Sequence, residues 1–153
     1  MQRTIIINVG QAKMDINKIE ELLILHEGKK NKAYICPAGK ITIGVGRNLE
    51  DKGLSDEEIE YLLHNDIKEC IQDLSHIFPN FYDLDDVRQA VLVDMRFNLG
   101  PARFRSFKKM IAAIRKGDFS KAAEEMKDSR WFEQVKQRGK RLYKMMKTGK
   151  WWE

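Results

Sequence analysis

The sequence predicts an α+β fold that is mostly α, with a small β lobe near the N-terminus, a helical C-terminal lobe and a cleft between them. Apolar residues recur at helical spacing from Asp15 to His26 and again from about residue 55 onwards. Between these regions, residues 34–49 are rich in glycine, aromatic and β-branched residues, which is typical of short strands. The chain has 153 residues, 42% of them hydrophobic, which suffices for one core divided into two lobes.

The first helix is expected to run from about Asp15 to Glu27, because Gly28 supplies a natural stop directly after the apolar pattern. The segment from Tyr34 to Leu49 then predicts a hairpin or a three-stranded sheet, with a turn at Ala38-Gly39. Both Cys36 and Thr42 fall on this β element.

A second helix is predicted to start near Ser55, because Glu58 follows three residues later and the two can form a capping box. This helix carries one apolar stripe and is expected to connect the sheet to the rest of the chain. The stripe consists of Ile59, Leu62, Leu63, Ile67, Cys70, Ile71 and Leu74. The position of Cys70 on it predicts a small core residue.

The C-terminal lobe is expected to contain a central helix from Val87 to Leu99, which is apolar nearly all round and is ended by Gly100-Pro101. Three further helices are predicted over Phe107–Lys116, Ser120–Lys127 and Arg130 to about Lys147. The predicted globular domain is 14–153, with a β lobe over about 31–54 and helical parts over 14–30 and 55–153. Residues 1–13 form a leader of unknown role.

The formal net charge is +5, and the basic excess gathers between Arg103 and Lys150. Such a surface attracts anionic partners, which include nucleic acid, anionic lipid and envelope polymers. The two cysteines and three histidines show no metal-ligand spacing, and no nucleotide motif is present, so neither a metal nor a cofactor is expected. Two cysteines are too few for a secreted disulfide scaffold, so synthesis in a reducing cytoplasm is expected. The N-terminal apolar run is too short for a signal peptide or a membrane span.

One motif carries most of the functional information. His26-Glu27-Gly28 is followed by Tyr34, Cys36 and Gly39 and then by Thr42-Ile43-Gly44-Val45-Gly46. This pattern closely resembles the signature of the phage T4-like lysozymes, glycoside hydrolase family 24, in which Glu is followed after eight residues by Asp or Cys and after five more by Thr. The resemblance extends through Phe97-Asn98-Leu99-Gly100 to the C-terminus and leaves out only residues 1–13.

The resemblance implies that Glu27 is the general acid, that Cys36 stands at the position of the partner on the opposite face, and that Thr42 positions the attacking water. A carboxyl group held partly out of water keeps its proton, which suits an acid, and a hydroxyl can hold a water. An ordinary thiol is mostly uncharged near neutral pH, so Cys36 is a weak base unless its surroundings stabilise the thiolate. A redox-controlled disulfide is a further hypothesis, with Cys70 as a doubtful partner.

The C-terminal lobe contributes three more predicted site residues. Phe97 and Asn98 end the central helix beside the expected cleft, and the resemblance implies that they bind substrate; for Asn98 a structural hydrogen bond is the alternative. Arg138 lies on the predicted apolar stripe of the last helix and needs a carboxylate partner, for which the resemblance supplies Glu27. A second ion pair, between Arg47 and Asp66, is expected to join the lobes.

The implied activity is hydrolysis of the β-1,4 bond between N-acetylmuramic acid and N-acetylglucosamine in bacterial peptidoglycan, with inversion, for host cell lysis. The expected protein is a monomer that acts on the periplasmic wall after the membrane is permeabilised. The alternative is a non-enzymatic basic module that binds envelope polymer or nucleic acid, although no nucleic-acid-binding motif is present. A separate hypothesis is that the basic and aromatic segment from Arg138 to Trp152 presses on anionic lipid.

Overall fold

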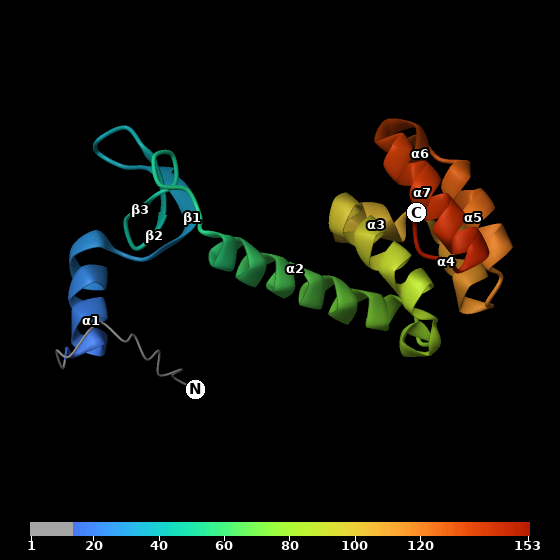
Figure 1. The fold of residues 1–153 in the computed structure, drawn as a ribbon, viewed down its shortest axis with the longest axis horizontal. Helices are drawn as coiled ribbons and strands as arrows, with labels where there is room; N and C mark the ends of the chain where they lie inside the picture. The colour runs from blue at the N-terminus through green and yellow to red at the C-terminus, as the bar shows by residue number, and fades with distance from the viewer. Residues whose placement is uncertain (1–13) are drawn as a thin grey trace. The chain divides into compact units, whose positions relative to one another are not determined.

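The computed structural model describes residues 14–153, and the predicted leader over residues 1–13 lies outside this part. The chain divides into two compact units, one ending at Glu58 and the other comprising Ile59–Glu153 (Figure 1). Helix α2 (Asp56–Ile77) runs through the boundary between them. None of the helices in the described part is long and apolar enough to cross a membrane. The predicted cleft between two lobes stays a prediction.

Helix α1 (Ile16–Glu27) has the bounds that the sequence predicts. It begins after Asp15, whose side chain accepts a hydrogen bond from the Lys18 backbone N–H at 3.1 Å. It ends because Gly28 adopts φ 79° and ψ 170°, which leaves the helical region. Glu27 is therefore the last residue of the helix, where its side chain can turn toward the sheet.

The sheet of the first unit has three antiparallel strands in the order β1 (Lys30–Ile35), β2 (Ile41–Gly44) and β3 (Arg47–Asn48). Thr42 lies in the middle strand, opposite Tyr34 on one side and Asn48 on the other. Its side of the strand is covered, since only 3% of the residue is exposed. The three-stranded alternative predicted from the glycine-rich and β-branched pattern is confirmed.

The start of α2 confirms the predicted capping box. The Ser55 backbone N–H donates to Glu58 Oε1 at 2.9 Å, and Ser55 Oγ accepts from the Glu58 backbone N–H at 3.2 Å. The Glu58 carboxylate is also held by Arg47, whose two terminal nitrogens each lie 2.8 Å from one of its oxygens. This arginine, followed by the Ser55 contacts, lowers the pKa of Glu58 to about 2.

The prediction that Arg47 pairs with Asp66 is wrong. The Arg47 guanidinium is occupied by Glu58 and by the Gly53 carbonyl oxygen, 3.2 Å from Nη1. The short connection after β3 brings the first turn of α2 back to the sheet, so the first-turn carboxylate reaches Arg47. The ion pair consequently closes the first unit on itself.

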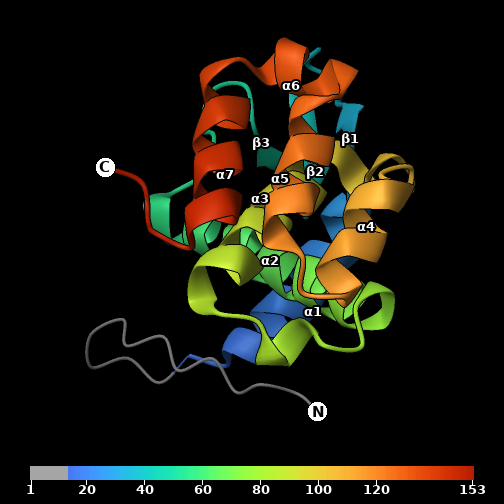
Figure 2. The same ribbon diagram turned by 90° about the vertical axis from the view of Figure 1, so that its right-hand side faces the viewer.

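The second unit is helical, with α3 (Asp86–Arg105), α4 (Lys108–Arg115), α5 (Phe119–Lys127), α6 (Arg130–Val135) and α7 (Gln137–Thr148) following α2 and a 3₁₀ turn, η1 (Phe81–Asp83). Figure 2 shows α5 lying between α4 and α7. The α+β class with predominant helix is thus confirmed. The largest fully buried side chains of the core are Phe78, Phe104, Leu74, Leu92, Met95, Met110, Ile114, Met126, Met146 and Val91.

Gly100 interrupts α3 with φ 79° and ψ 171°, at the position where the sequence predicts the central helix to end. The prediction of one helix from Arg130 to Lys147 is wrong, because Lys136 has φ 51° and ψ −114° and separates α6 from α7. Gly139 allows the two helices to approach closely, since a Cβ there would lie 3.1 Å from the Phe132 carbonyl oxygen. No residue at the break favours a positive φ, so the amino-acid sequence of this segment did not predict a helix end there.

A buried charge cluster joins α2 to α3. Arg96 is 7% exposed, and its Nε donates to Asp73 Oδ2 at 2.6 Å. The same carboxylate accepts from Arg105 through both oxygens, with Nη1 to Oδ2 at 2.9 Å. The hydrogen bonds from Arg105 and then Arg96 lower the pKa of Asp73 to about 2. One carboxylate therefore serves two guanidinium groups.

Candidate functional site

Glu27 lies against the turn between β2 and β3. A Cβ atom on Gly46 would lie 2.9 Å from Glu27 Oε2 and 3.1 Å from its Cδ, so the carboxyl group occupies the space that a side chain at residue 46 would need. Gly46 also has φ 66°, which L side chains rarely adopt. Two requirements therefore select glycine at this position, and one of them is the Glu27 side chain itself.

The apolar shelter expected around Glu27 is not supplied by its own unit. The residue is exposed to solvent, and no residue of α1 is buried. The physical reason is its place at the helix end, where Gly28 turns the chain away and leaves only the glycine turn beside the carboxyl group. The first unit therefore provides contact on one side of Glu27 alone.

Cys36 follows the last residue of β1 and sits in a tight turn. Its backbone N–H donates to the Lys40 carbonyl oxygen at 3.0 Å, and its carbonyl oxygen accepts from the Gly39 N–H at 2.8 Å. The thiol is partly exposed and forms no disulfide in the described part of the chain. The backbone N–H of Lys40 and next the Thr42 hydroxyl lower the pKa of the Cys36 thiol. The turn therefore favours the thiolate, which is the form that can accept a proton.

Thr42 is brought directly beside Cys36 by the β1–β2 turn. Its Oγ1 donates to the Lys40 carbonyl oxygen at 2.9 Å. A hydroxyl has a single hydrogen, so it can serve either this carbonyl or the Cys36 thiolate at one time, and its lone pairs stay available to accept from a water. The structure thus brings together two of the three predicted catalytic residues and places the third on the same small unit.

The predicted substrate residues of the second unit lie just before the break in α3. Phe97 is 47% exposed, so its side chain is accessible to solvent although it follows the buried part of α3. Asn98 Oδ1 accepts from Trp131 Nε1 at 2.8 Å, so the structural hydrogen bond that was the alternative for Asn98 exists. Within residues 14–153 its amide nitrogen makes no hydrogen bond, so the two uses of this side chain are compatible.

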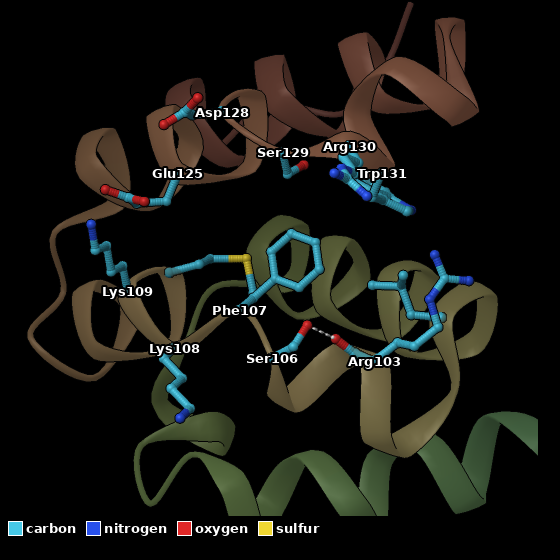
Figure 3. A pocket seen from close by; sticks show the side chains of 12 residues that line it. Arg103, Ser106, Phe107, Lys108, Lys109, Glu125, Asp128, Ser129, Arg130 and Trp131 are labelled. Atoms are coloured by element: carbon cyan, nitrogen blue, oxygen red, sulfur yellow. Dashed lines mark hydrogen bonds between the residues drawn. The ribbon is translucent and has the colours of Figure 1, made fainter.

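Trp131 connects Asn98 to a cavity of about 500 Å³ between α3, α4 and the α5–α6 connection. In Figure 3, Phe107 and Trp131 project into the space between the helices, with Arg103 and Glu125 at its sides. The two rings pack edge to face, with their centroids 6.0 Å apart. Aromatic rings flanked by charged groups suit a ligand with both apolar and polar faces. The sequence did not predict this cavity, because its lining residues come from several separate segments.

Arg138 forms its ion pair with Asp94, with Nε 2.7 Å from Oδ1. The need for a carboxylate partner is thereby met from α3, and the guanidinium is partly exposed, at 39%, rather than buried. The expected pair with Glu27 would join the two units, and it stays a prediction.

Cys70 is 3% exposed in the core end of α2, as its place on the apolar stripe predicts. Burial raises the pKa of its thiol, the reverse of the shift at Cys36. A thiol of this kind is inert. In the described part of the chain no group of histidine, cysteine and carboxylate side chains could hold a metal ion.

A helix ending in a glutamate, a three-stranded sheet and a helical bundle together define a lysozyme-like α+β protein. The family model described as "Phage lysozyme" matches residues 25–148, so the chain belongs to this family. It is 26% identical over 166 residues to probable T4-type lysozyme 1 of Dictyostelium discoideum, which covers 88% of this chain and 96% of that protein. A second such protein, probable T4-type lysozyme 2, is 25% identical with the same coverage.

The chain is also 26% identical over 157 residues to the pre-baseplate central spike protein Gp5 of Enterobacteria phage T4. That match covers 84% of this chain and 27% of the spike protein, so the shared region is one part of a longer relative. The family assignment gives the activity class, lysozyme-type glycoside hydrolysis, with peptidoglycan as the implied substrate.

Proposed function

We propose that the protein cleaves the β-1,4 bond between N-acetylmuramic acid and N-acetylglucosamine with inversion, as an endolysin. The observation that carries the proposal is the meeting of the family's residues on one small unit: Glu27 against Gly46 at one turn, and Cys36 beside Thr42 at another. Inverting hydrolysis needs an acid on one side of the sugar and a group that activates water on the other. The release of reducing N-acetylmuramic acid ends from purified peptidoglycan tests the bond that is cut, and the anomeric configuration of the newly formed end, followed by NMR, tests the inversion.

Glu27 donates the proton to the leaving glycosidic oxygen. The close contact of Oε2 with Gly46 restricts the carboxyl group on the side of the turn, and the opposite side is open to solvent. A bound glycan that covers this side would remove water from the carboxyl group and so supply the shelter that its own unit lacks. The bound substrate thus supplies the cover from water that Glu27 needs to keep its proton.

Cys36 and Thr42 act on the water. Thr42 is anchored by the middle strand and 97% covered, so its hydroxyl is held in place by the sheet rather than by its own rotamer preference. Cys36 accepts the proton of that water as a thiolate, which the Lys40 N–H stabilises. Thr42 thus positions the water, and Cys36 accepts its proton.

The second unit binds the sugar chain. The exposed face of Phe97 can stack on a sugar ring, and the free amide nitrogen of Asn98 can donate to a substrate carbonyl or hydroxyl. Trp131 fixes the Asn98 side chain, so this donor is held in one orientation. Arg138 supports the same site through its ion pair with Asp94.

The role of Cys36 makes a testable prediction. Replacement of Cys36 by Ser removes the proton acceptor and should lower kcat by about 10²-fold or more, whereas Cys36→Asp should restore activity because a carboxylate is charged at lower pH. Since the pKa of the thiol is lowered, alkylation by iodoacetamide should proceed at a lower pH than with free cysteine. The measurement is kcat against pH for the three proteins.

The Cys36→Asp enzyme should keep its activity toward acidic pH, where the wild-type rate falls as the thiolate is protonated. Near-full activity of Cys36→Ser would contradict the proposed role and transfer it to Thr42 and its water.

A second prediction concerns Gly46. In Gly46→Ala the new Cβ would collide with the Glu27 carboxyl group, which must then move, so kcat should fall by about 10²-fold for a displacement near 1 Å. Gly117→Ala is the matched control, because Gly117 also has a positive φ, meets nothing within 4 Å and lies between α4 and α5, away from the turn that holds Cys36. The two variants should lose similar stability and differ in activity; equal kcat values would show that the Glu27 contact is unimportant.

In its biological setting the protein would be made in the host cytoplasm, would reach the periplasmic wall after the membrane is permeabilised, and would act as a monomer to lyse the host. The test uses cells that express the protein. Lysis of these cells when a membrane-permeabilising agent is added, and no lysis without the agent, would support this route. Lysis without permeabilisation would contradict it.

A second candidate function is contact with anionic lipid. Leu142, Met145 and Met146 are buried in the core, so this part of the predicted lipid-binding segment cannot face a membrane. Trp151 and Trp152, however, are 52% and 60% exposed and follow the lysine-rich α7. Replacing both by Ser should reduce dye leakage from anionic liposomes, with leakage from neutral liposomes as the control; unchanged leakage would remove this function.

A further inference from the structure

We infer that the second unit holds a phosphate-binding site where the ends of α2 and α3 meet α4. A cavity of about 350 Å³ lies there, away from Asn98 and Trp131. Four of its six lining residues are basic and none is acidic: His76, Ile77, Arg105, Lys108, Ile111 and Arg115. The inference does not rest on the proposed lysozyme chemistry, since none of the predicted catalytic residues lines this cavity.

The charge of Arg115 is not neutralised. Its guanidinium donates from Nε and Nη2 to the Ile77 carbonyl oxygen at 3.0 and 2.7 Å. Within residues 14–153 no carboxylate oxygen lies within 4.0 Å of it. A carbonyl fixes the orientation of the group without cancelling its charge, so the remaining nitrogen is a prepositioned donor.

Arg105 belongs to a group of charges that has one positive charge in excess. It and Arg96 both bind the single carboxylate of Asp73, so two cations face one anion and one positive charge remains. Arg96 is buried, whereas the Arg105 side chain is 45% exposed and lines the cavity. The surplus charge is consequently available at the cavity wall.

Lys108 supplies a third positive charge. In the part of the chain from 14 to 153 its ammonium group makes neither a hydrogen bond nor an ion pair. Figure 3 shows its side chain pointing toward α2, while that of the neighbouring Lys109 points toward Glu125 of α5. Both lysines line the larger cavity beside Trp131, and of the two Lys108 alone also lines the smaller one.

Three surplus charges around one cavity match a dianion better than a single carboxylate, and arginine and lysine are the usual donors to phosphate oxygens. The His76 ring adds a further donor at the rim. Ile77 and Ile111 provide an apolar wall that can take the carbon side of an ester. The expected ligand is therefore a phosphate dianion, which could come as free phosphate or as the phosphomonoester headgroup of a lipid.

The test is a titration of the folded full-length protein with inorganic phosphate, followed by backbone amide NMR shifts. Saturable shifts are expected at Lys108, Ile111 and Arg115, and Lys108→Gln should weaken binding by about tenfold, since a charged hydrogen bond is lost. Lys109→Gln is the matched control, because it removes the same charge from the same helix outside the cavity, and it should bind as the wild type does. His76→Gln should weaken binding less than Lys108→Gln.

Vesicles of phosphatidylcholine with and without phosphatidic acid separate the two sources. If the site takes a lipid headgroup, phosphatidic acid vesicles should sediment the wild type and Lys109→Gln but not Lys108→Gln; if it takes free phosphate alone, the three proteins should sediment equally while the NMR difference persists. The inference is overturned if phosphate produces no saturable shifts at the cavity, or if the two lysine variants weaken phosphate binding equally.

Discussion

Replacement of Glu27 by Gln should lower kcat on purified peptidoglycan by about 10²–10⁴-fold, because the amide cannot give a proton to the leaving oxygen. The substitution keeps the size of the side chain, so the contact with Gly46 and the end of α1 should survive. KM should change little, since the lost interaction belongs to the transition state. The measurement is the initial rate of reducing-end release at several substrate concentrations.

Glu20→Gln provides the matched control. Glu20 lies two turns earlier on the same helix, is exposed, and makes no ion pair in the described part of the chain. The control should keep wild-type kcat although it changes the net charge by the same amount. A protein that only binds envelope polymer or nucleic acid through its basic residues would treat the two variants alike, and such a result would favour the non-enzymatic alternative.

Replacement of Asp73 by Ala should destabilise the protein by about 3–5 kcal/mol, which corresponds to roughly 6–20 °C in Tm. The variant leaves the buried Arg96 guanidinium without a carboxylate and frees Arg105 as well. Asp66→Ala, on an exposed turn of the same helix, should change stability by less than about 0.5 kcal/mol. Thermal unfolding followed by circular dichroism measures both.

The pH dependence of stability gives an independent check on Asp73. Its pKa in the folded protein is about 2, below its ordinary value of 3.8, so folding favours the charged form. The resulting stabilisation is complete above about pH 4 and is lost as the pH falls toward 2. The wild type should therefore lose more stability than Asp73→Ala over this interval. Equal losses would mean that the cluster contributes nothing.

The local signals of the sequence predicted the positions that depend on local physics. Gly28 ends α1 and Gly100 interrupts α3 because glycine alone adopts these dihedral angles readily. The pair Ser55 and Glu58 started α2 through a contact three residues apart, which any window of the sequence contains. The spacing of Glu27, Cys36 and Thr42 identified the family for the same reason, as all three lie on one short segment.

The partners of the long charged side chains could not be predicted in this way. Arg47 binds Glu58 rather than Asp66, and Arg138 binds Asp94, because such side chains reach whichever carboxylate the packing brings near. The sequence contains many candidates within reach of each arginine. The break at Lys136 is accompanied by a close approach of Gly139 to Phe132, a contact that no spacing rule expresses.

The cavity beside Trp131 shows a third kind of limit. Its lining comes from α3, α4 and the α5–α6 connection, and no single stretch of sequence displays a pattern for it. The residues were individually unremarkable as basic or core positions. Their convergence depends on the kink at Gly100 and on the arrangement of α4 and α5, which only the tertiary structure defines.

Product analysis of purified peptidoglycan by mass spectrometry tests the central claim most directly. If Glu27 protonates the glycosidic oxygen while Cys36 and Thr42 deliver water, the wild type should release fragments that end in reducing N-acetylmuramic acid, and Glu27→Gln should release almost none. Fragments with anhydro-sugar ends, or equal product from both proteins, would contradict it.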